Sequence, residues 1–133
     1  SRPFGPIMGL VTLPNSILDG LQKVSSEILN SSNRESYGQY LAGVINEEPL
    51  INESDFIKAG AKDFIEKIIY SYVINNSKGS GYTKENGYVI SSFIREAWIV
   101  SQYANEYNPL HNHLGCEISS VIYLNIPELH LMF

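Results

Sequence analysis

Residues 98–125 read WIVSQYANEYNPLHNHLGCEISSVIYLN, and this stretch decides how the rest of the chain is interpreted. Two runs rich in β-branched and aromatic residues flank a turn-rich centre that holds His111 and His113. Asn108-Pro109 predicts a turn before the pair, and Gly115 allows the backbone to change direction after it. In extended backbone, residues i and i+2 point to the same side, so both imidazoles can reach one metal ion. The spacing therefore predicts a metal site on the lip of a strand.

Outward from this stretch, the pattern predicts strands joined to two helices. β-branched and aromatic residues predict strands at residues 4–13, 89–95, 97–103 and 117–125. A first helix, capped by Asn15 or Ser16, follows from apolar residues at helical spacing, which are Ile17, Leu21, Val24 and Ile28. A second, longer helix begins after a cap at Asn52 or Ser54 and buries a broad face, comprising Phe56, Ile57, Phe64, Ile65, Ile68, Ile69, Tyr72 and Val73.

Residues 98–127 resemble the iron-binding core of the non-haem iron(II), 2-oxoglutarate-dependent oxygenases. The branch they resemble is common in marine bacteria and their phages, and reads W-x-V-x-Q, then Y-N-P-x-H-x-H, then S-x-V-x-Y-L-x-x-P. The positions that match are Trp98, Val100, Gln102, Tyr107, Asn108, Pro109, His111, His113, Ser119, Val121, Tyr123, Leu124 and Pro127. Residues 4–7 and 41–48 resemble further segments of the family less specifically.

The resemblance implies an α+β fold, namely the N-terminal part of a double-stranded β-helix (jelly roll) with two supporting helices. Residues 1–133 would then form one oxygenase-like domain that is incomplete, because the distal histidine and the 2-oxoglutarate-binding arginine of the family are expected after the sequence ends at Phe133. His130 is the alternative third ligand, but a turn at Pro127 would direct it away from His113.

The resemblance further implies an iron(II)- and 2-oxoglutarate-dependent dioxygenase that hydroxylates a small-molecule or peptide substrate. Iron(II) would be held by His111 and His113, and 2-oxoglutarate would be contacted by Gln102, Tyr107 and Tyr123; core packing is the alternative for both tyrosines. Most relatives have a carboxylate where this chain has His113. The imidazole brings no negative charge, so we expect weak iron binding.

Two other hypotheses compete with this one. The first is a catalytically inactive, truncated oxygenase-like module that self-associates, since unpaired strand edges and residues 129–133 would favour pairing with another copy. The second is a cupin-like isomerase or dioxygenase with an all-histidine site, which would need no 2-oxoglutarate. Under the first hypothesis in particular, we expect a homo-oligomer.

Composition limits the partners and the compartment. Nine basic and fourteen acidic residues give a net charge of −5 without a Lys/Arg cluster, so we expect no nucleic-acid partner. No apolar run approaches membrane-spanning length, and we expect no membrane partner. Cys116 is the one cysteine, predicted to be a buried residue at the start of a strand, and a reducing, cytoplasmic location is expected. Glu47 and Glu48 are predicted to be solvated or to support a helix, and acid/base catalysis is the alternative. Arg95 is predicted to pair with Glu96 or Glu106, and binding of an acid substrate is the alternative.

Overall fold

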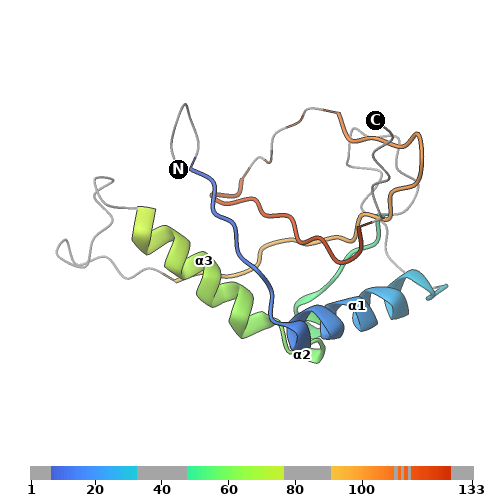
Figure 1. Cartoon of the computed structure of the whole chain (residues 1–133), viewed down its shortest axis with the longest axis horizontal. Helices are drawn as coiled ribbons and strands as arrows, with labels where there is room; N and C mark the ends of the chain where they lie inside the picture. The colour runs from blue at the N-terminus through green and yellow to red at the C-terminus, as the bar shows by residue number, and fades with distance from the viewer. Residues whose placement is uncertain are drawn as a thin grey trace, which may run out of the picture.

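The structure, a computed structural model, describes residues 7–32, 48–76, 91–109, 111, 113 and 115–126. Within these residues the chain forms three α-helices and no β-strand: α1 (Asn15–Leu29), α2 (Glu53–Lys58) and α3 (Lys62–Asn76). Figure 1 shows the helices along one side of the molecule, with long non-helical segments running beside them. For the described residues, the predicted α+β jelly roll, or double-stranded β-helix, is therefore wrong.

The predicted strands fail because their apolar residues pack on the helices and form no ladder with one another. Of these segments, residues 7–13, 91–95, 97–103 and 117–125 are described and contain no strand; the remaining residues, 4–6 and 89–90, lie outside the described residues. One face of these segments lies against the core through Leu13, Ile94, Ala97, Ile99, Ile122 and Leu124. Preference for strands measures how well a side chain fits a half-buried extended surface, and packing on helices satisfies that preference without strand pairing.

Helix α1 forms where the apolar spacing predicts it, but its cap differs from the prediction. The N-cap residue is Pro14, whose carbonyl accepts hydrogen bonds from the backbone N–H groups of Ile17 and Leu18, both at 3.0 Å. Asn15 and Ser16 lie inside the helix, so the predicted side-chain cap is wrong. Leu21 and Val24 are buried, as their spacing predicts.

The second predicted helix is two helices, because Gly60 ends α2. Gly60 has a φ of +69°, in the left-handed region. Its N–H donates to the Ile57 carbonyl and the Ala61 N–H donates to the Phe56 carbonyl, both at 2.9 Å, which is the pattern of a Schellman motif. The predicted cap at Asn52 is confirmed, and the Asn52 N–H donates to Asp55 Oδ2 at 2.9 Å. Gly60 therefore turns the chain from α2 into α3.

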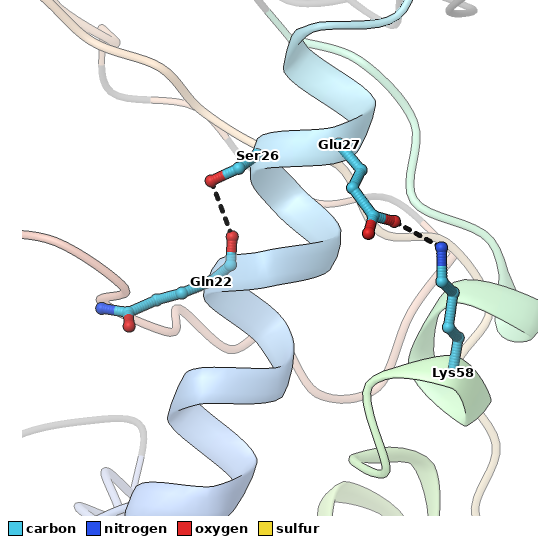
Figure 2. A network of polar contacts seen from close by, with 4 residues as sticks. All are labelled: Gln22, Ser26, Glu27 and Lys58. Carbon is cyan, nitrogen blue, oxygen red and sulfur yellow. Dashed lines mark hydrogen bonds and ion pairs between the residues drawn. The ribbon is translucent and has the colours of Figure 1, made fainter.

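Helices α1 and α2 touch where Gly20 faces Ala59. A Cβ on Gly20 would lie 3.0 Å from the Ala59 carbonyl carbon and closer still to its oxygen, so only glycine permits this approach. At the surface, Lys58 of α2 donates to Glu27 of α1 (Figure 2). Both side chains are largely exposed, so this ion pair adds little to stability.

The core lies among the three helices and the segment before α2. Its buried apolar residues are Leu21, Val24, Ile51, Phe56, Ala59, Ala61 and Ile65. The broad face predicted for the second helix is confirmed at Phe56 and Ile65. It is wrong at Ile57, which is 60% exposed and lies one residue before the end of α2.

Two long-range contacts hold the non-helical segments in place. Residues 49–51 run antiparallel to residues 97–99: Ile51 N–H donates to the Ala97 carbonyl (3.1 Å), Ile99 N–H donates to the Pro49 carbonyl (2.9 Å), and Leu50 pairs with Trp98. Gln22 of α1 donates from Nε2 to the Leu124 carbonyl at 2.6 Å. Among the described residues, no helix is both long enough and apolar enough to cross a membrane.

Candidate functional site

The loop before the histidine pair is held by a tight turn. The Tyr103 N–H donates to Glu106 Oε2 (2.9 Å), and the Glu106 N–H donates to the Tyr103 carbonyl (3.1 Å). Asn105, inside this turn, has a φ of +72°, a conformation that asparagine tolerates better than most residues. The turn reverses the chain between Trp98 and the histidines.

His111 and His113 direct their imidazoles toward one another, as their spacing predicts. Their Nε2 atoms are 3.2 Å apart, whereas the ring centroids are 4.8 Å apart with an interplanar angle of 71°. The Nε2 edges therefore face each other. Both side chains are exposed, so ions in solution can reach the pair.

Neighbouring groups fix the orientation of each ring. His111 Nδ1 lies 2.8 Å from the Pro109 carbonyl oxygen. Because a carbonyl only accepts, Nδ1 carries the proton in this contact, and a neutral His111 keeps its lone pair on Nε2. The His113 ring lies 5.8 Å from the Trp98 ring, tilted by 32°. Trp98 in turn is held by its pairing with Leu50.

A complete metal-binding site does not form in the described part of the chain. Within residues 7–32, 48–76, 91–109, 111, 113 and 115–126, no group of three or more His, Cys, Asp or Glu side chains could hold a metal ion. The prediction of a metal site is therefore wrong for a complete site within these residues. They offer two imidazoles, those of His111 and His113. His130, the alternative third ligand, lies outside the described residues.

Cys116 does not occupy the buried position predicted for it. The thiol is exposed, and it donates to the His113 carbonyl at 3.6 Å. The prediction assumed a buried strand after Gly115, and the described residues form no strand there. The thiol therefore contacts the backbone of the histidine loop.

The three residues expected at 2-oxoglutarate lie on the surface. Gln102 donates from Nε2 to the Glu106 carbonyl at 2.5 Å and so belongs to the turn. Tyr107 is 57% exposed and Tyr123 is 71% exposed, so core packing, the alternative for both, is wrong. A role for Gln102, Tyr107 and Tyr123 at 2-oxoglutarate stays a prediction.

Glu48 is the site residue that sequence reasoning missed. It is 2% exposed, and no described residue donates a hydrogen bond to its Oε1. Burial raises the pKa of its carboxyl, the nearby negative charge of Glu106 raises it further, and the positive charge of His111 opposes the shift. The prediction that Glu48 is solvated is wrong: Glu48 is buried and directly precedes residues 49–51, which are hydrogen-bonded to residues 97–99. The neighbouring Glu47 lies outside the described residues.

Arg95 makes structural contacts, as predicted. Its Nε lies 4.0 Å from Glu96 Oε1, which confirms the ion pair expected at that position. Its guanidinium also donates to the carbonyl of Gly115, whose φ is +78°. A cleft of about 300 Å³ lies beside it, lined by Leu50, Ile51, Asn52, Glu53, Ile94, Arg95, Glu96 and Ala97. The histidines do not line this cleft.

Comparison with known proteins adds no relative: no family model matches the chain, and no curated protein or solved structure matches it. The resemblance to oxygenases therefore rests on the residues of the sequence quoted above.

Proposed function

We propose that this chain binds iron(II) through His111 and His113 and acts as a 2-oxoglutarate-dependent dioxygenase that hydroxylates a small-molecule or peptide substrate. The single observation that carries the proposal is the 3.2 Å separation of the two Nε2 atoms. The resemblance of residues 98–127 to that enzyme family supplies the reaction class. The fold gives it no support, since the jelly roll is absent from the described residues.

The separation of the two nitrogens fits two adjacent ligands of one metal ion. With metal–nitrogen distances of about 2.1 Å, nitrogens 3.2 Å apart subtend roughly 100° at the metal. This angle lies between the octahedral and tetrahedral values. The pair thus fits two positions of an iron site, and the described residues offer no third.

When bound, iron(II) with 2-oxoglutarate and oxygen supplies oxidative decarboxylation of the co-substrate and hydroxylation of a C–H bond. The residues of this chain would orient the two imidazoles that hold the metal. The Pro109 carbonyl holds His111 with Nε2 toward His113, and the Trp98 ring lies beside the His113 ring. We assign Gln102, Tyr107 and Tyr123 to contacts with 2-oxoglutarate on the strength of the resemblance.

Metal binding and turnover test the proposal separately. Calorimetric titration with iron(II) under anaerobic conditions should show weak binding that is lost in His111→Ala and in His113→Ala. Asn112→Ala, which leaves both imidazoles in place, is the matched control and should bind as the wild type does. Aerobic incubation with iron(II) and 2-oxoglutarate should then yield succinate. Binding that survives loss of either histidine would overturn the assignment, and a metal-bound protein that forms no succinate would overturn the reaction class. Metal-dependent turnover without 2-oxoglutarate would favour the all-histidine, cupin-like alternative.

A second candidate function is a non-catalytic module that self-associates, and one observation favours it. Large apolar side chains are exposed on the non-helical segments, among them Met8, Leu10, Phe93, Val121, Tyr123 and Ile126. Such exposed surface is typical of association sites. Light scattering of the metal-free chain should show a dimer or larger species, and a monomer at high concentration would exclude this candidate. For either function we propose a cytoplasmic location, where the exposed thiol of Cys116 would stay reduced.

A further inference from the structure

We propose that Glu48 is a positioning residue for the metal site, which supplies through its buried carboxylate the negative charge that a cation between His111 and His113 requires. This inference rests on the proposed metal binding by the two histidines. It assigns to Glu48 a role that the resemblance does not, because Glu48 lies 63 residues before His111 and outside the family's histidine motif.

The backbone places Glu48 beside the histidine loop. Residues 49–51 pair with residues 97–99, and Leu50 lies opposite Trp98, whose ring faces His113. Glu48 directly precedes this paired segment. Its carboxyl interacts electrostatically with the side chain of His111, and a positive charge at that place favours the ionised carboxylate. A bound cation would offer the same attraction at the same place.

The burial of Glu48 has no compensation among the described residues. A buried polar group without a hydrogen bond costs free energy, and an ionised one costs more. No described donor reaches Glu48 Oε1, and the carboxylate of Glu106 repels the charged form. A divalent cation held by the imidazoles would compensate both carboxylates. Two neutral imidazoles bring no negative charge, so the nearby carboxylates would also stabilise the cation.

Glu48 acts through its field and not as a ligand. The described residues contain no group of three metal-ligating side chains, so Glu48 does not complete a ligand set with His111 and His113. Groups beyond the ligands of a metal site commonly change its affinity by about 10- to 100-fold. An effect of this size is expected from Glu48.

The test compares nickel(II) and iron(II) affinities of the wild type with those of three variants, measured by anaerobic calorimetry on the whole chain. Glu48→Gln removes the charge and keeps the shape, and it should raise the Kd about 10-fold or more. Glu48→Asp keeps the charge and should stay much closer to the wild type. Glu117→Gln, at an exposed position in the segment after the histidines, is the matched control and should leave the Kd unchanged.

The melting temperature gives a second measurement that a merely structural role would not move in the same way. Without metal, Glu48→Gln should fold at least as well as the wild type at neutral pH, because it removes a buried charge. With nickel(II), the wild type should gain more in Tm than Glu48→Gln does. Equal affinities in the wild type and Glu48→Gln would overturn this inference and leave the histidine site in place. Equal losses in Glu48→Gln and Glu48→Asp would also overturn it, since packing would then be the cause. A wild type that binds neither metal would overturn both proposals.

Discussion

The contact between Gly20 of α1 and Ala59, the C-cap residue of α2, predicts that Gly20→Ala destabilises the fold. The new Cβ would lie 3.0 Å from the Ala59 carbonyl carbon, 3.3 Å from its Cα and closer still to its oxygen. The obstacle is backbone, so no side chain can rotate away. The helices must separate, and Leu21 and Val24, which are buried beside the contact, lose packing with them.

Two effects of opposite sign set the magnitude. Alanine is favoured over glycine inside a helix by about 1 kcal/mol. Forcing an extra carbon into a packed contact costs about 1–3 kcal/mol, and the rigid backbone here places the cost at the upper end. The net loss should be about 1–2 kcal/mol in the free energy of unfolding. For a chain of this length, that loss lowers Tm by roughly 3 to 8 °C.

Thermal unfolding followed by circular dichroism at 222 nm measures the effect, with urea unfolding as a check. Asp19→Ala, at the preceding exposed position of α1, is the matched control and should leave Tm nearly unchanged. A Gly20→Ala protein as stable as the wild type, or more stable by the helix preference of alanine, would refute the close approach of α1 to α2.

Three further predictions concern the α2–α3 turn, the core and Glu48. Gly60→Ala should cost about 1–2 kcal/mol, because its φ of +69° is left-handed, and Gly60→Asn should cost less; equal urea midpoints for all three proteins would exclude this conformation. Phe56→Ala should cost about 3–5 kcal/mol by leaving a cavity in the core, whereas Ile57→Ala, at a residue 60% exposed, should change stability by only about 0.5 kcal/mol; reversed costs in urea unfolding would contradict the position of the helix. Burial raises the pKa of Glu48 above its ordinary value of 4.5, so its contribution to stability is fully present below pH 4.5 and is lost as the pH rises through the folded-state pKa. Urea unfolding over a pH series should therefore show the free energy of unfolding of Glu48→Gln rising relative to that of the wild type as the pH rises. A difference between the two proteins that does not change with pH would show that the pKa of the Glu48 carboxyl is not raised.

Local patterns in the sequence predict the helices because their causes are local. The spacing of Leu21 and Val24 fixes the buried side of α1, and Asn52 marks the start of α2. Gly60, between two alanines, was the available signal for the break between α2 and α3. This signal is ambiguous in a single sequence, because isolated glycines are also tolerated inside helices.

The strands and the environment of Glu48 depend on distant contacts, which a single sequence does not display. β-branched residues at 97–103 and 117–125 predict extended backbone, but whether such segments pair or pack on helices depends on what lies beside them. The convergence of His111 and His113 could be predicted, because the relative direction of residues i and i+2 depends only on the backbone between them. The burial of Glu48 could not, because it depends on the pairing of residues 49–51 with residues 97–99.

The hydrogen bond from Gln22 to the Leu124 carbonyl has a consequence for the order of folding. It joins residues 102 positions apart, whereas α1, α2 and α3 are each built from neighbours in sequence. Closing so long a loop costs entropy that only later contacts recover, and contacts between distant residues slow folding. The helices should therefore form early and residues 117–126 should dock late. In hydrogen exchange, amides of α1 near Leu21 should then be protected before those near Leu124.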